Sequence, residues 1–308
     1  GVSIFFGVKK PKHTKGVAKV YKADMFGRRD DKFNYLEKNS VSTVKWVSAP
    51  PISPDYSWVV RNEEIRSVYL NGLSVNELFP ISSIGIVTSR DAFVIESSRE
   101  TLEKRIRDFV SSSSVSEAKS KFDVREGKNW KIEVALNHSF SKENIYPISY
   151  RPFDDRFVYY HNDFIERSRR DVMQHLFGQN NIAMLIKRQG KQKFSYIFCT
   201  NKITESCMFE SAYANNTVAP LYVFKNGQKM SNLNIKLVEH IESLVGKTTP
   251  EEIFDYVYSY LHSEKYREKF QEFLKIDFPR VPFPADKNQF DNLTKLGHRL
   301  RNLHLMSD

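Results

Sequence analysis

The sequence predicts an α+β protein, in which a mixed or antiparallel sheet has flanking helices and a helical module follows at the C-terminus. Three apolar runs with strand character cover residues 157–160, 182–186 and 194–199, and polar stretches separate them. Apolar residues at helical spacing mark residues 97–110 and most of the chain after residue 232. A chain of 308 residues can bury one large core or two to three smaller ones.

Three regions are expected, covering residues 1–96, 97–246 and 247–308. In the first region, residues 2–8 and 17–21 have the pattern of two strands in a hairpin, and residues 28–39 have helical spacing. The sequence starts without an initiator Met and shows no signal peptide. We therefore expect a segment of a longer polypeptide.

The second region opens with two predicted helices. Residues 97–100 (Ser-Ser-Arg-Glu) form a capping box, and the helix that follows turns Leu102, Ile106 and Phe109 inward. A second helix is expected over residues 126–137, with Trp130 and Val134 four residues apart on one face. In the strand that follows, Tyr159 and Tyr160 alternate, so one is expected in the core and one at the surface.

The C-terminal module carries the clearest helix signals. A helix that begins near Asn234 is expected to stop at Gly246. Thr249 with Pro250 and Glu252 combines an N-cap, a proline at the first helical position and an acidic residue that closes a capping box. Ser263 and Asp286 are the expected N-caps of two further helices.

The net charge of +10 is concentrated in two segments. Residues 1–40 hold ten Lys and Arg against four Asp and Glu, and residues 151–202 hold ten against five. Two basic segments on a neutral background indicate a polyanionic partner, although a basic surface without any partner gives the same composition. No apolar run approaches the roughly 20 residues of a membrane helix, and two cysteines, Cys199 and Cys207, fit a reducing cytoplasm.

Catalytic patterns are absent or weak. A methyltransferase needs a glycine-rich turn for its cofactor, and the sequence contains no Gly-x-Gly. Its single Pro-Pro pair, at residues 49–52 (Ala-Pro-Pro-Ile), lacks the amide or carboxylate and the aromatic ring that a flipped adenine requires. Asp108 with Glu117 and Lys119 matches the letters of a nuclease motif, but these residues lie in a helical region.

The histidines show no metal-ligand spacing, and no metal site is expected. His13 lies in a lysine-rich loop, and the others are scattered: His138, His161, His175, His240, His262, His298 and His304.

The strongest functional pattern is the basic and amide side chains between the strands of the second region. Arg and Lys can bind the major-groove edge of guanine, and Gln can pair with adenine. The alternative is a solvated hairpin tip. The candidate DNA contacts are Arg167, Arg169, Arg170, Lys187, Arg188, Gln189, Lys191, Lys193 and Lys202, with Lys9 and Lys12 nearer the N-terminus. Arg151 and Arg156 stand beside Asp154 and Asp155, so salt bridges are expected there instead.

Several segments of this sequence recur in the same order in one family. They are residues 150–156, 169–173, 202–206, 220–222, 232–234, 253–258, 261–269 and 273–283. On these residues, the chain resembles the C-terminal part of Type ISP restriction–modification enzymes. The helical tail is the most specific part of the resemblance, and residues 85–91 look like the end of the preceding methyltransferase region.

The resemblance implies a target-recognition domain that binds double-stranded DNA. It also implies upstream methyltransferase, ATPase and nuclease domains in the same polypeptide, which would use S-adenosylmethionine, ATP and Mg²⁺. The methyltransferase of such enzymes modifies adenine. This segment itself is expected to hold no catalytic residue and no cofactor. A structural docking module that binds DNA without sequence preference remains the alternative.

Overall fold

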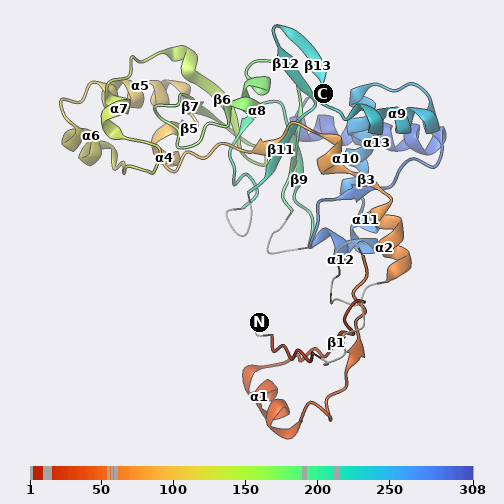
Figure 1. Ribbon diagram of the computed structural model, residues 1–308. Helices are drawn as coiled ribbons and strands as arrows, with labels where there is room; N and C mark the ends of the chain where they lie inside the picture. The colour runs from red at the N-terminus through yellow and green to blue at the C-terminus, as the bar shows by residue number, and fades with distance from the viewer. Residues whose placement is uncertain are drawn as a thin grey trace. The chain divides into compact units, whose positions relative to one another are not determined.

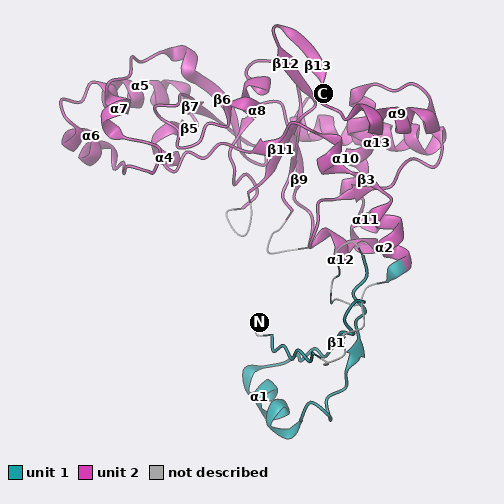
Figure 2. Cartoon of the chain, in the orientation of Figure 1, with its two compact units in different colours: residues 1–63 teal, residues 64–308 magenta. Residues whose placement is uncertain are grey.

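The computed structural model describes residues 3–9, 16–53, 56, 58, 62–188, 193–210 and 215–307 (Figure 1). The chain divides into two compact units, residues 1–63 and 64–308 (Figure 2). In the described part of the chain, no helix combines the length and the apolar composition needed to cross a membrane.

The first unit has little regular structure. Strand β1 (Tyr21–Lys22) pairs antiparallel with β2 (Val47–Ser48), and α1 (Arg29–Lys38) lies between them in the sequence. The predicted hairpin of residues 2–8 and 17–21 is therefore wrong, because the partner of Tyr21 is Ser48 and the described residues 3–9 form no strand. The predicted helix is confirmed, although α1 buries none of its residues.

The second unit contains two four-stranded sheets. The first has the order β10-β6-β7-β5, with β10 parallel to β6 and the other pairs antiparallel. The second has the order β4-β11-β8-β9 and is antiparallel throughout. The Ser149 and Thr200 hydroxyls, 2.7 Å apart, connect β6 to β9. The expected mixed and antiparallel sheets are thus present.

The strand bounds are as follows. The first sheet comprises β5 (Ile95–Glu96), β6 (Ile145–Arg151), β7 (Asp154–Tyr159) and β10 (Ile203–Thr204). The second comprises β4 (Ser83–Ile84), β8 (Ala183–Ile186), β9 (Ile197–Thr200) and β11 (Thr217–Pro220). Two small pairs complete the set, β12 (Tyr222–Lys225) with β13 (Gln228–Ser231) and β3 (Leu73–Ser74) with β14 (Arg280–Val281).

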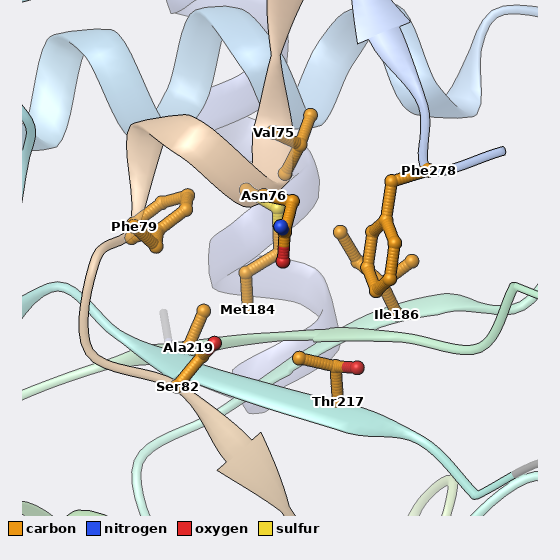
Figure 3. A pocket seen from close by; sticks show the side chains of 9 residues that line it. All are labelled: Val75, Asn76, Phe79, Ser82, Met184, Ile186, Thr217, Ala219 and Phe278. Carbon is orange, nitrogen blue, oxygen red and sulfur yellow. The ribbon is translucent and has the colours of Figure 1, made fainter.

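Strand β8 separates two hydrophobic cores. Successive side chains of a strand point to opposite faces, so Ala183 and Leu185 enter the first core while Met184 and Ile186 enter the second. Figure 3 shows Met184 and Ile186 around a small pocket beside α3 (Val75–Leu78). The pocket lining contains no titratable side chain, so it offers no group for acid–base chemistry.

Short helices enclose the first core: α4 (Asp91–Val94), α5 (Arg99–Val110), α6 (Val115–Phe122) and α7 (Ile132–Leu136). The side chains predicted to point inward from α5 are fully buried. The predicted helix over 126–137 shrinks to α7, and in the residues before it Asn129 N–H donates to the Glu166 carboxylate, which occupies the space beside Gly127 where a Cβ would lie. Trp130 is consequently buried, while Val134 is 52% exposed. Tyr159 and Tyr160 are both buried, contrary to expectation.

The remaining helices enclose the second core: α2 (Glu63–Leu70), α3, α9 (Ile235–Val245), α10 (Pro250–His262), α11 (Glu264–Lys269), α12 (Gln271–Leu274) and α13 (Lys287–Leu305). The predicted caps are confirmed, since Thr249 forms a capping box with Glu252 and Asp286 accepts the Gln289 N–H. Helix α13 packs along α10 (Figure 1). Arg301 of α13 forms a 2.6 Å salt bridge with the buried Asp255.

Candidate nucleic-acid interface

Two short clusters within residues 151–202 form the candidate interface, and they are called the first and second basic segments from here on. The first basic segment is residues 167–170, which follow β7 and lead into α8 (Arg170–Met173). Arg167 pairs with Val87 through two backbone hydrogen bonds of 2.9 and 3.0 Å, and its side chain is exposed. The preceding residue, Glu166, points inward to Arg90 at 3.1 Å, with both side chains less than a tenth exposed. The Arg90 guanidinium also lies 4.0 Å from the Trp130 ring centroid. A buried ion pair thus fixes the backbone that presents Arg167.

The other two arginines of this segment differ in exposure. Arg169 adopts a left-handed conformation (φ 53°) as the N-cap residue of α8, and its buried Nε has no hydrogen-bond partner among the described residues. Arg170 is exposed, with its guanidinium 5.9 Å from the Phe177 ring centroid. Arg167 and Arg170 therefore present charge at the surface, and Arg169 is only partly accessible.

The second basic segment is residues 187–193, which lie between β8 and β9 and of which residues 187, 188 and 193 are described. Lys187 is only 1% exposed, and its ammonium donates a 2.7 Å hydrogen bond to the carbonyl oxygen of Glu210. The prediction that Lys187 contacts DNA does not fit this position, because the charge is enclosed by protein. Arg188 and Lys193 are exposed, while Gln189 and Lys191 lie outside the described residues.

The loop after β10 packs against this second segment. Besides the Lys187–Glu210 contact, the Tyr196 and Phe209 rings meet edge to face with centroids 5.8 Å apart. Asn216 N–H donates to Ser206, which closes the loop ahead of β11. The two connections therefore stand together at one end of the β4-β11-β8-β9 sheet.

Residues 83–87 join the two basic segments. Ile84 pairs with Thr217 of β11, and Ile86 exchanges backbone hydrogen bonds with residues 204 and 206. Val87 then pairs with Arg167. Gly85 is required in this segment, because a Cβ there would lie 2.5 Å from the Glu205 backbone. Residues 83–87 therefore pair directly with Arg167 and are connected to the second basic segment through β11 and β8.

Salt bridges occupy other predicted cations. Arg156 binds Asp154 at 2.7 Å, as expected, and this hydrogen-bonded partner lowers the pKa of Asp154. Arg151 instead binds the buried Glu205 at 3.3 Å. Lys202, a predicted DNA contact, lies 2.8 Å from Asp155 and keeps a quarter of its side chain exposed.

The Tyr150 ring contacts two guanidinium groups, and its hydroxyl binds Asp91. The Arg151 and Arg156 guanidinium carbons lie 3.9 and 4.2 Å from its ring centroid. Its hydroxyl donates to Asp91 at 2.9 Å. Burial, together with the Asp91 hydrogen bond, raises the pKa of Tyr150, so the phenol stays protonated and continues to donate.

The remaining sequence candidates lie elsewhere. Lys9 is exposed in the first unit, and Lys12 lies outside the described residues. Asp108 and Glu117 belong to helices α5 and α6, and Glu117 binds the backbone and hydroxyl of Ser113.

Sequence reasoning missed two groupings. It gave no role in the candidate interface to Arg90 or Glu166. It also left His138 and His161 unpaired, although both lie against Asp163. No local spacing announces either grouping, because their members come from separate loops.

Three solved structures are similar to this chain. DrdV in a complex with DNA has a TM-score of 0.69 at 21% identity, covering 91% of this chain and 30% of that one. A nuclease-deletion mutant of the Type ISP restriction–modification enzyme LlaGI, in complex with a DNA substrate mimic, has 0.62 at 22%, covering 90% and 27%. The ATP-dependent Type ISP enzyme LlaBIII bound to DNA has 0.66 at 20%, covering 85% and 18%.

These TM-scores show a shared fold, and the chain spans less than a third of the length of each of these proteins. No curated protein matches the chain. The family model described as the Type ISP C-terminal specificity domain matches residues 77–308. Because that match spans most of the chain, the protein belongs to the Type ISP C-terminal specificity domain family.

Proposed function

We propose that this chain recognises a specific sequence in double-stranded DNA as the specificity part of a restriction–modification enzyme. The observation that carries the proposal is a pair of exposed arginines: Arg167 pairs with the segment of residues 83–87, and Arg188 follows β8, which is connected to that segment through β11. Family membership supports it. The similar structures of DrdV, LlaGI and LlaBIII were each determined with DNA or a DNA mimic.

Recognition would divide between the two kinds of cation. A guanidinium such as that of Arg188 can donate two hydrogen bonds to the O6 and N7 atoms of guanine, which distinguishes this base in the major groove. Flanking side chains such as Lys193 would bind phosphates and set the register without reading sequence. The rigid backbone at Arg167 favours a defined contact, because little conformational freedom is lost on binding.

We further propose that the parent enzyme is an adenine-N6 methyltransferase and endonuclease. Its catalytic residues, together with the sites for S-adenosylmethionine, ATP and Mg²⁺, would belong to domains upstream of this chain. The lack of any Gly-x-Gly and of an Asn-Pro-Pro-aromatic loop in this sequence supports that division.

A docking module with only non-specific DNA binding is the second candidate. It is favoured by the neutralisation of Lys187, Lys202 and Arg156 by acidic partners, which reduces the charge available to DNA. Both candidates predict salt-sensitive binding, with a slope of log K against log salt of about −0.9 for each phosphate contact. They differ in whether binding depends on base sequence.

Selection of the chain's preferred duplex from a random library, followed by titration, separates the two. A specific reader binds the selected duplex far more tightly than a scrambled duplex at two salt concentrations, typically by at least about a thousandfold. Equal affinities for the two duplexes at both salt concentrations would contradict sequence-specific recognition and favour the docking module.

A further inference from the structure

Three potential metal ligands converge beside the first basic segment. His138 follows α7, while His161 and Asp163 lie in the turn after β7. The Asp163 Oδ2 atom lies 3.1 Å from His138 Nδ1 and 3.3 Å from His161 Nδ1. Among the described residues, this is the one group of three whose donor atoms all lie within 4.8 Å of one another.

His161 Nδ1 lies close to both the backbone and the side chain of Asp163. The Asp163 backbone N–H lies 3.2 Å from His161 Nδ1, and the Asp163 Oδ2 atom lies 3.3 Å from the same nitrogen. The single lone pair of Nδ1 can accept that N–H or bind a cation, whereas the other tautomer donates Nδ1–H to the carboxylate. A cation bound by Nδ1 and Oδ2 would therefore replace a hydrogen bond in this contact.

We propose that His138, His161 and Asp163 bind a divalent transition metal ion, for which zinc is the best match. A tetrahedral zinc ion with bonds of about 2.0–2.1 Å separates its ligand atoms by about 3.3–3.4 Å. The two nitrogen–oxygen distances, 3.1 and 3.3 Å, lie close to that spacing. Two imidazoles and one carboxylate form a recurrent donor set for zinc, with a water molecule as the fourth ligand.

The surroundings hold the ligands as a metal site requires. Tyr159 is fully buried, and its hydroxyl lies 2.9 Å from His138 Nε2, where it can accept that nitrogen's proton when Nδ1 binds metal. Ser141 N–H also binds this hydroxyl at 3.1 Å and fixes its position.

A metal-free hydrogen-bonded cluster is the competing explanation. In it, His138 Nδ1–H donates to Asp163 while Nε2 accepts the Tyr159 hydroxyl proton. That arrangement also satisfies His161, whose Nδ1 accepts the Asp163 N–H or donates to the Asp163 carboxylate. The metal site is favoured by geometry, because three donor atoms converge within 4.8 Å of one another at nitrogen–oxygen distances close to the tetrahedral spacing.

A bound ion would clip the chain after α7 to the turn that leads into Arg167. The Asp163 carbonyl already accepts the indole N–H of the buried Trp130 at 2.7 Å. The ion would therefore stabilise the base of the first basic segment without belonging to its exposed surface.

The test is direct titration of the chelator-treated chain with Zn²⁺ by calorimetry and with Co²⁺ by visible absorption, which reports coordination geometry. We expect one ion per chain and the intense spectrum of tetrahedral Co²⁺. His161→Gln and Asp163→Asn should each weaken binding by at least about tenfold. His240→Gln, which removes an exposed imidazole from α9, is the matched control and should bind as the unmodified chain does.

Thermal unfolding gives a second measurement. Saturating Zn²⁺ should raise the Tm of the unmodified chain and of His240→Gln, because the ion binds only the folded state. The same addition should leave the Tm of His161→Gln and Asp163→Asn nearly unchanged. The proposal is overturned if Zn²⁺ does not saturate a single site, or if both ligand variants bind like the control, since either result means an adventitious ion only.

Discussion

At the start of each basic segment, two consecutive charged residues point in opposite directions, one inward and one outward. The two segments differ in how the inward residue is stabilised. Before α8, Glu166 points inward to Arg90 and Arg167 points outward. After β8, Lys187 points inward to Glu210 and Arg188 points outward. Arg90, the partner of Glu166, contacts the ring of Trp130 in the first core, whereas Glu210, the partner of Lys187, belongs to the loop after β10. The first segment should therefore be the more rigid, and only part of the basic sequence is available to a polyanion.

The largest expected effect comes from breaking the buried Arg90–Glu166 ion pair beside the first basic segment. Glu166→Ala leaves the Arg90 guanidinium buried without its carboxylate, and we expect the free energy of unfolding to fall by about 3 kcal/mol. Urea unfolding measures this loss. Lys287→Ala, which breaks the exposed pair with Asp291 on α13, should cost less than about 1 kcal/mol. A loss in Glu166→Ala no larger than in this control would show that the pair does not fix the segment.

The second segment should respond to Lys187→Met with a smaller loss of stability. This change keeps the apolar stem but removes the ammonium that donates to the Glu210 carbonyl and lies 3.6 Å from the Glu210 carboxylate, so the free energy of unfolding should fall by about 1–3 kcal/mol. The salt dependence of DNA binding should stay the same, since the ammonium is buried. If the salt slope falls by about one phosphate contact while stability holds, Lys187 reaches DNA after all.

Arg188→Ala tests the outward neighbour. A base-reading guanidinium would be lost, so binding to the selected duplex should weaken by about 1–3 kcal/mol with relaxed preference at one base pair. Urea unfolding should be unaffected because the side chain is exposed. The matched control is Arg299→Ala, which removes an exposed arginine of α13 that lies outside both segments. Equal binding by the two variants would remove Arg188 from the recognition surface.

The smallest expected effect is a difference in pH dependence between two buried carboxylates. Burial alone would raise the pKa of Glu166, but the Asn129 N–H and Arg90 hold it below its usual value. Burial raises the pKa of Glu205. The Glu166 contribution to stability is therefore present above the unfolded-state pKa of about 4.3 and is lost as pH falls through the folded-state pKa. The Glu205 contribution is present below that value and lost as pH rises through the folded pKa.

Denaturant unfolding between pH 3 and pH 7, about the range spanned by these carboxyl groups, distinguishes the two. Relative to the unmodified chain, Glu166→Gln should lose the most free energy of unfolding at the upper end of this pH range. Glu205→Gln should have its most favourable free energy of unfolding relative to the unmodified chain at that same end, because it removes a carboxyl group whose ionisation destabilises the folded state. Parallel curves for the two variants would contradict this assignment of signs.

The parts predicted correctly from the sequence are those whose signals are local. The caps at Thr249 and Asp286 depend on residues within one helical turn, so a short stretch of sequence determines them. The apolar run of β8 was also recognisable, although its division between two cores was not. The N-terminal hairpin was wrong because a distant residue, Ser48, supplies the pairing partner of Tyr21.

That the candidate interface contacts DNA stays a prediction, and the structure bears only on how its side chains are placed. The sequence marked both basic segments, but it could not show that Glu210 encloses the charge of Lys187 or that Asp155 pairs with Lys202. These partners come from other strands and loops. Nor could the sequence show that the Glu166 carboxylate binds Asn129 N–H ahead of the shortened helix α7.

Strand β8 has a consequence for how the second unit unfolds. Its four residues are at most 2% exposed and contribute alternately to both cores, so neither core can melt without uncovering apolar side chains that face the other. Partial unfolding of one half would leave a solvated apolar strand at the margin of the surviving half. The melting of residues 64–308 should therefore be a single cooperative transition, with calorimetric and van't Hoff enthalpies that agree.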